Sequence, residues 1–106
     1  RAAEAKKREA EAGVRLQVRQ AYADLMAAQE RVEVASAAVA QAEESLRIIK
    51  NRYEAGLATV TDLLRNETAL LEARTRRLAA LYDQRVAAAM LELATGALTI
   101  DSEVLK

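Results

Sequence analysis

A single glycine constrains this chain more than any other residue. Gly56 stands alone between two long helical patterns, and the chain has only three glycines and no proline. Glycine adopts the backbone conformations of sharp turns without the steric cost that a side chain brings. Between Gly13 and Gly96 no other residue offers such a turn. The sequence therefore predicts two long helices folded back at one sharp tip.

The residues before Gly56 repeat with the period of a coiled coil. Apolar side chains fill two heptad rows that alternate at spacings of four and three residues. Small side chains in one row let a neighbouring helix approach closely. We expect a helix over residues 3–54 that packs along this seam. One row is bulky and the other is mostly alanine: Val18, Leu25, Val32, Val39, Leu46 and Tyr53, against Val14, Ala21, Ala28, Ala35, Ala42 and Ile49.

The second helix has a clear start signal. Thr59-Val60-Thr61-Asp62 fits a capping box, in which the Thr59 hydroxyl accepts from the Asp62 amide and the Asp62 carboxylate reaches back. We expect this helix over residues 59–95, with Gly96 as its C-terminal stop.

The apolar face of the second helix is broad. Leucines 64, 71 and 78 repeat every seven residues, and Leu63 and Leu70 form a second line. Tyr82, Val86, Ala89 and Leu93 continue the stripe after a shift in phase, and polar residues such as Thr68 and Thr75 interrupt it. Such a face predicts contact with more than one neighbour.

The fold class that follows is all-α, a long antiparallel two-helix coiled-coil hairpin. We expect the hairpin at residues 1–96, its tip at 55–58, and a tail at 97–106 that leads to a separate region. Hydrophobic residues reach 52% but aromatic residues only 3%, and one layer of two helices cannot bury a large core. The chain also begins in mid-pattern at Arg1, as a piece of a larger protein would.

Composition argues against an enzyme. Without histidine or cysteine, the usual nucleophile–base pairs and soft-metal sites cannot form. The sequence suggests no cofactor, and no apolar run is long enough for a membrane helix. Sixteen basic and sixteen acidic residues cancel, which disfavours nucleic-acid binding. Glu11–Arg15, Glu43–Arg47 and Glu72–Arg76 have the spacing of helical ion pairs on a solvated face.

Three segments together resemble a known family. Residues 52–64, RYEAGLATVTDLL, look like the helix–turn–helix signature of TolC-type outer-membrane efflux proteins. Residues 18–25, VRQAYADL, and residues 82–96, YDQRVAAAMLELATG, resemble the flanking segments of the same family. The resemblance covers nearly all of residues 1–97. Family members carry two such repeats, and Tyr82-Asp83 makes this chain look more like the second.

The resemblance implies a function. Such proteins are trimeric outer-membrane channels with an α-helical barrel in the periplasm, and they work with an inner-membrane transporter and a periplasmic adaptor in efflux or type I secretion. This chain would be one hairpin of that barrel. Its tip, with Arg52, Gly56, Leu57 and Ala58, would dock the adaptor.

The resemblance also implies candidate residues at the pore entrance. Asp62 matches an entrance-facing acid of some members; the two roles are compatible, but capping the helix is the better explanation. Arg65 stands where some relatives place a second acid, so an acidic ring is in doubt. Tyr53 matches a position that ties neighbouring hairpins together in some members, but it is also the last bulky residue of the seam.

Two other interpretations remain open at this stage. The chain could be the hairpin of a periplasmic adaptor, but that family usually has an Arg-Leu-Ser/Thr tip, whereas this tip is Ala-Gly-Leu-Ala. It could also be a generic coiled-coil scaffold or interaction module without a transport role. The exported substrate and the oligomeric state of the isolated chain are not encoded in any motif.

Overall fold

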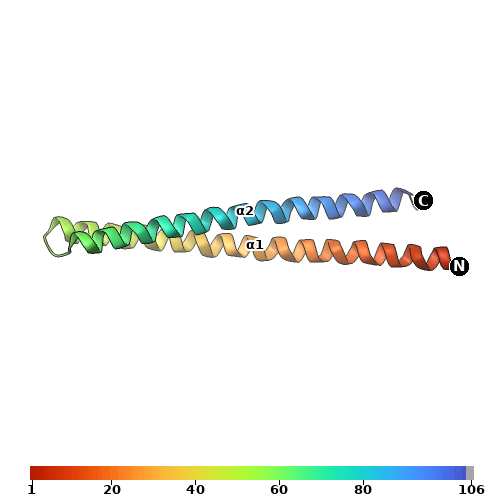
Figure 1. Cartoon of the computed structure of the whole chain (residues 1–106), viewed down its shortest axis with the longest axis horizontal. Helices are drawn as coiled ribbons and strands as arrows, with labels where there is room; N and C mark the ends of the chain where they lie inside the picture. Colours follow the sequence, from red (N-terminus) through yellow and green to blue (C-terminus); the bar gives the residue numbers. More distant parts are fainter. Residues whose placement is uncertain (105–106) are drawn as a thin grey trace. The chain divides into compact units, whose positions relative to one another are not determined.

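The computed structural model describes residues 1–104, with the side chains of residues 1–97, 99 and 100. Helix α1 spans Ala2–Glu54 and helix α2 spans Val60–Val104, and the described residues contain no strand. A short turn around Gly56 joins the two helices (Figure 1). The predicted all-α hairpin is confirmed. The chain divides into two units: a tip unit, Gln29–Tyr82, and a terminal unit, Arg1–Ala28 with the part of α2 from Asp83 onward.

The predicted seam of α1 is confirmed along almost its whole length. Every seam position from Val14 to Ile49 is buried or half-buried, and most positions between them are exposed. Tyr53, the last position of the bulky row, is exposed instead. The seam therefore ends one helical turn before the tip.

In the tip unit, α1 and α2 pack around a small apolar cluster. Val39, Leu70 and Ala73 are buried, and Ala42 and Leu46 pack against them. No large side chain of the described residues is fully buried. A pair of helices with so thin a core gains little from burial by itself.

Helix α2 of the tip unit carries two heptad rows of residues, and only one of them faces α1. The inner seam is buried or half-buried apart from Arg77, whereas the outer seam, one or two positions further along, is exposed. The second line of leucines in the sequence thus forms the hairpin contact, and the first line does not. The inner seam comprises Leu63, Asn66, Leu70, Ala73, Arg77 and Ala80; the outer seam comprises Leu64, Thr68, Leu71, Thr75, Leu78 and Tyr82.

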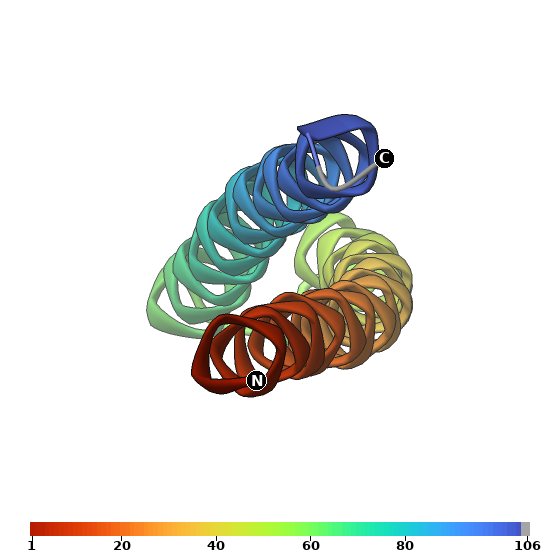
Figure 2. The same ribbon diagram turned by 90° about the vertical axis from the view of Figure 1, so that its right-hand side faces the viewer.

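In the terminal unit the α1 seam continues with the same kinds of residue. Ala28 is completely buried, and Val18, Ala21 and Leu25 are half-buried on α1. Viewed end on, the two segments of this unit are uninterrupted helices (Figure 2).

The expected helix stop at Gly96 is wrong, because α2 continues to Val104. Of the three glycines, only Gly56 has a positive φ, so Gly96 does not adopt the left-handed conformation of a helix cap. A glycine inside a helix costs only about 1 kcal/mol, which a long helix tolerates. The tail expected at residues 97–106 is therefore helical as far as it is described, and residues 105–106 lie outside the described part.

The charged residues pair differently from the expected spacing. Arg47 contacts Glu44 at 2.6 Å instead of Glu43, and Glu43 lies 3.8 Å from Arg74 on α2. The hydrogen bond between Arg47 and Glu44 lowers the pKa of the Glu44 carboxyl. Glu43 is thus directed across the hairpin and not along its own helix.

Candidate functional site at the hairpin tip

The C-terminal end of α1 closes with a Schellman motif. The Leu57 amide donates to the Arg52 carbonyl at 2.7 Å, and the Gly56 amide donates to the Tyr53 carbonyl at 3.0 Å. These two bonds require a left-handed residue between them, and Gly56 supplies it with a φ of 78°. A Cβ at Gly56 would meet no atom within 4 Å. The glycine is therefore needed for its backbone conformation and not for space.

The N-terminal end of α2 has the predicted capping box. The Asp62 amide donates to Thr59 Oγ1 at 3.1 Å, and the Thr59 amide donates to Asp62 Oδ2 at 3.2 Å. The hydrogen bond from the Thr59 backbone amide is the main cause that lowers the pKa of the Asp62 carboxyl. The hydrogen bond with the Thr59 side chain and the nearby positive charge of Arg65 lower this pKa further. Only Ala58 separates this cap from the Schellman motif, so hydrogen bonds fix the backbone on both sides of the turn.

Leu57 is the most exposed large apolar side chain in the described part of the chain, at 79%. In a Schellman motif the residue at this position commonly packs on the helix that it follows. Here the corresponding helical position is Arg52, whose exposed side chain offers no apolar partner. The turn thus holds an unpaired leucine on a fixed backbone.

The tip brings together the four residues expected to dock a partner. Arg52, Gly56 and Leu57 are exposed, and Ala58 is half-buried. Of the three entrance candidates, Tyr53 and Arg65 are exposed on either side of the turn. Asp62 has its carboxylate engaged in the capping box, so its capping role is confirmed, and an entrance role stays a prediction.

The outer seam of α2 is a second candidate surface. Leu71, Leu78 and Tyr82 are 64%, 68% and 68% exposed. Thr75, which the sequence suggested as an interruption, donates its hydroxyl to the Leu71 carbonyl at 2.9 Å. Because that polar group already has a partner within the helix, Thr75 adds no unsatisfied donor to the seam.

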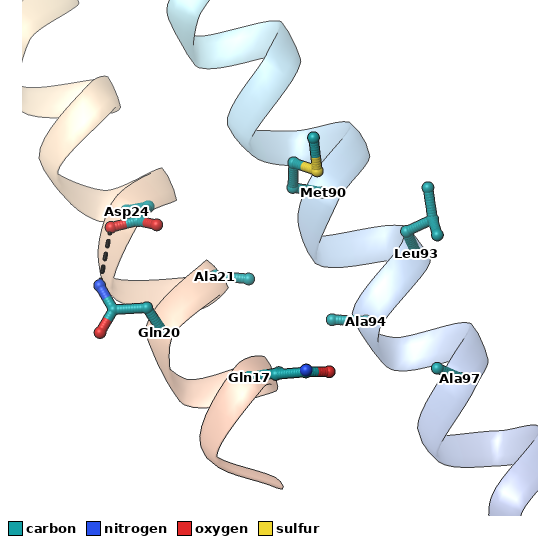
Figure 3. Close-up of a pocket in the computed structure, with 8 residues that line it drawn as sticks. All are labelled: Gln17, Gln20, Ala21, Asp24, Met90, Leu93, Ala94 and Ala97. Atoms are coloured by element: carbon teal, nitrogen blue, oxygen red, sulfur yellow. Dashed lines mark hydrogen bonds between the residues drawn. The ribbon is translucent and has the colours of Figure 1, made fainter. Parts of the chain in front are cut away.

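A groove of about 400 Å³ lies within the terminal unit. Figure 3 shows Ala21 of α1 and Ala94 of α2 pointing toward one another across it. On the α1 side, Gln20 donates to Asp24 at 3.0 Å (Figure 3). Two small residues thus leave space between the helices, and the nearby polar groups bond to each other. The groove has no convergent set of polar groups of the kind that fixes a small ligand.

The described residues contain no cluster of acidic side chains suited to a metal ion. Within the same residues, neither helix has a segment that is long and apolar enough to cross a lipid bilayer. The tip and the outer seam are the two candidate surfaces.

Comparison with known families agrees with this architecture. The sequence model of the outer membrane efflux protein family matches residues 1–97. No curated protein and no solved structure matches the chain. The family is one of channel and transport components and not of enzymes. Because the match covers nearly the whole chain, the chain belongs to the outer membrane efflux protein family.

Proposed function

We propose that this chain is one periplasmic hairpin of an outer-membrane channel in an efflux or type I secretion system, and that its tip docks a periplasmic adaptor protein. Membership of the outer membrane efflux protein family supports the first part of this proposal, that the chain is a component of a channel. The observation that carries the docking role is the exposed Leu57 on a turn whose two sides are fixed by hydrogen bonds. The inner-membrane transporter would then connect to this chain only through the adaptor.

The chemistry of the tip suits a helical partner. Leu57 offers an apolar anchor, and Arg52 offers a charge five residues before it. An exposed apolar side chain at the centre of a small contact contributes most when its own backbone is already ordered, because little conformational entropy is lost on binding. The Schellman motif and the capping box provide that order.

The test uses the full-length channel protein in cells. We expect Leu57→Ser to reduce both co-purification of the adaptor and drug efflux, because the apolar anchor is lost. The matched control is Leu93→Ser, which removes another mostly exposed leucine, in the terminal unit. Gly56→Val should also weaken adaptor association while helicity stays nearly unchanged. Wild-type adaptor binding and efflux in both tip variants would refute the docking role.

The outer seam supports a second part of the proposal, that copies of this chain associate with one another. Leu64, Leu71 and Leu78 repeat every seven residues on a face that α1 leaves uncovered. A continuous heptad row of this kind fits another long helix. We therefore propose that neighbouring copies cover it, as a trimeric barrel in the full-length protein would require.

A further inference from the structure

We propose that the hydrogen bond between Arg77 and Ser36 selects which seam of α2 faces α1. Arg77 Nε donates to Ser36 Oγ at 3.1 Å, from α2 to α1. This inference concerns the pairing inside the hairpin, so it does not depend on the partner of the tip.

The tip unit presents a choice between two seams. The outer seam has three leucines and a tyrosine and no charge, whereas the inner seam contains the polar residues Asn66 and Arg77. By apolar content alone, α1 would bury the outer seam. The structure shows the opposite, with Leu70 at 7% exposure and Leu71 at 64%. Some contact that only the inner seam makes must therefore offset the greater apolar content of the outer seam.

Close packing of alanines is one such contact. Ala73 and Ala80 of the inner seam are both buried, and the outer seam has no alanine in the tip unit. Small residues allow the helices to approach closely and to gain dispersion contacts. However, this close approach leaves no room for a large side chain at the seam position between them, which is Arg77.

Arg77 resolves this conflict by extending to the edge of α1. Its side chain is exposed, and its guanidinium donates to the half-buried Ser36 next to the seam position Ala35. One residue step turns a helix by about 100°. Turning α2 to bury the outer seam would therefore carry Arg77 away from Ser36 and break the bond. A polar seam residue that has a partner on the facing helix in only one pairing favours that pairing.

The experiment compares single cysteines at positions 70 and 71 in a chain that has no natural cysteine. Each variant, Leu70→Cys or Leu71→Cys, is made in the 106-residue chain and alkylated at a dilution where sedimentation shows monomers. The ratio of the alkylation rates at positions 70 and 71 reports which seam is protected. We expect Ser36→Ala to reduce the protection of position 70 relative to 71 by about fivefold, the effect of one net hydrogen bond.

Two further variants make the result specific. Ser45→Ala changes another serine of α1, an exposed one, and should leave the ratio unchanged. Adding Arg77→Ala to Ser36→Ala places a small side chain between Ala73 and Ala80 of the inner seam and should restore the protection of position 70. Helicity should stay constant, since alanine is the better helix former. An unchanged ratio in Ser36→Ala, or no restoration in the double variant, would overturn the proposal.

Discussion

At the scale of the residue, the three glycines have different roles, and their backbone conformations set these roles. Gly56 has a φ of 78°, whereas Gly13 and Gly96 lie inside the helices without positive φ. All three have open space where a Cβ would stand. Only backbone conformation separates them, so the same substitution should have opposite effects on stability.

We predict that Gly56→Ala destabilises the hairpin by about 1–2 kcal/mol, because alanine is strained in the left-handed region. Gly13→Ala and Gly96→Ala should each stabilise by about 0.5–1 kcal/mol, because alanine is the stronger helix former. Thermal unfolding followed by circular dichroism measures all three. A stabilising effect of Gly56→Ala would contradict the Schellman turn.

At the scale of the element, the start of α2 should make stability depend on pH. Hydrogen bonds from Thr59 lower the pKa of Asp62 below its ordinary value of 3.8. A carboxyl whose pKa is lowered by folding stabilises the folded state above its unfolded pKa, and the contribution is lost as the pH falls through the folded value. Asp62→Asn should therefore destabilise the hairpin at neutral pH and lose less stability than wild type on acidification.

The measurement is the melting temperature of both chains from pH 7 to pH 2. Thr59→Ala, which removes the hydroxyl acceptor, should cost about 1 kcal/mol at neutral pH. Glu44→Gln is a useful comparison, because the pKa of Glu44 is also lowered but by Arg47, far from the cap. Identical acid sensitivity of wild type and Asp62→Asn would show that the capping box does not hold in solution.

The helices also show how far the sequence determines the packing. From Val14 to Ile49 the α1 seam was predictable residue by residue, because its apolar rows have no rival phase on that helix. On α2 the two leucine lines differ by a single position, and periodicity cannot choose between them. The choice depends on Ala73, Ala80 and the bond from Arg77 to Ser36, all of which need α1 in place. Likewise, Gly96 could equally end a helix or lie within one.

At the scale of the whole molecule, the candidate site was predictable in location but not in geometry. The turn at Gly56 and the cap at Thr59 follow from residue types. The exposure of Leu57 does not, because it results from the absence of an apolar residue at the position that a Schellman turn places beside it. Local sequence signals thus located the tip, and only the structure showed what it offers to a partner.

The uncovered outer seam leads to a prediction about association of the whole chain. The hairpin buries few side chains, and Leu71 and Leu78 remain mostly exposed. Contiguous exposed apolar surface favours self-association, so we expect the 106-residue chain to form oligomers in sedimentation velocity. Leu71→Glu should raise the dissociation constant by on the order of tenfold or more, because an unpaired carboxylate would be buried at the contact.

The control separates the outer seam from exposed leucines in general. Beyond Tyr82, the same heptad positions of α2 hold Arg85 and Glu92, so the apolar seam does not extend into the terminal unit. Leu16→Glu on α1 in that unit adds the same charge at a leucine that is 67% exposed and lies outside the α1 seam, and it should leave association nearly unchanged. If the two variants weakened association equally, the contact would depend on apolar surface as such and not on the heptad row. A folded wild-type chain that stays monomeric at high concentration would contradict the prediction of self-association.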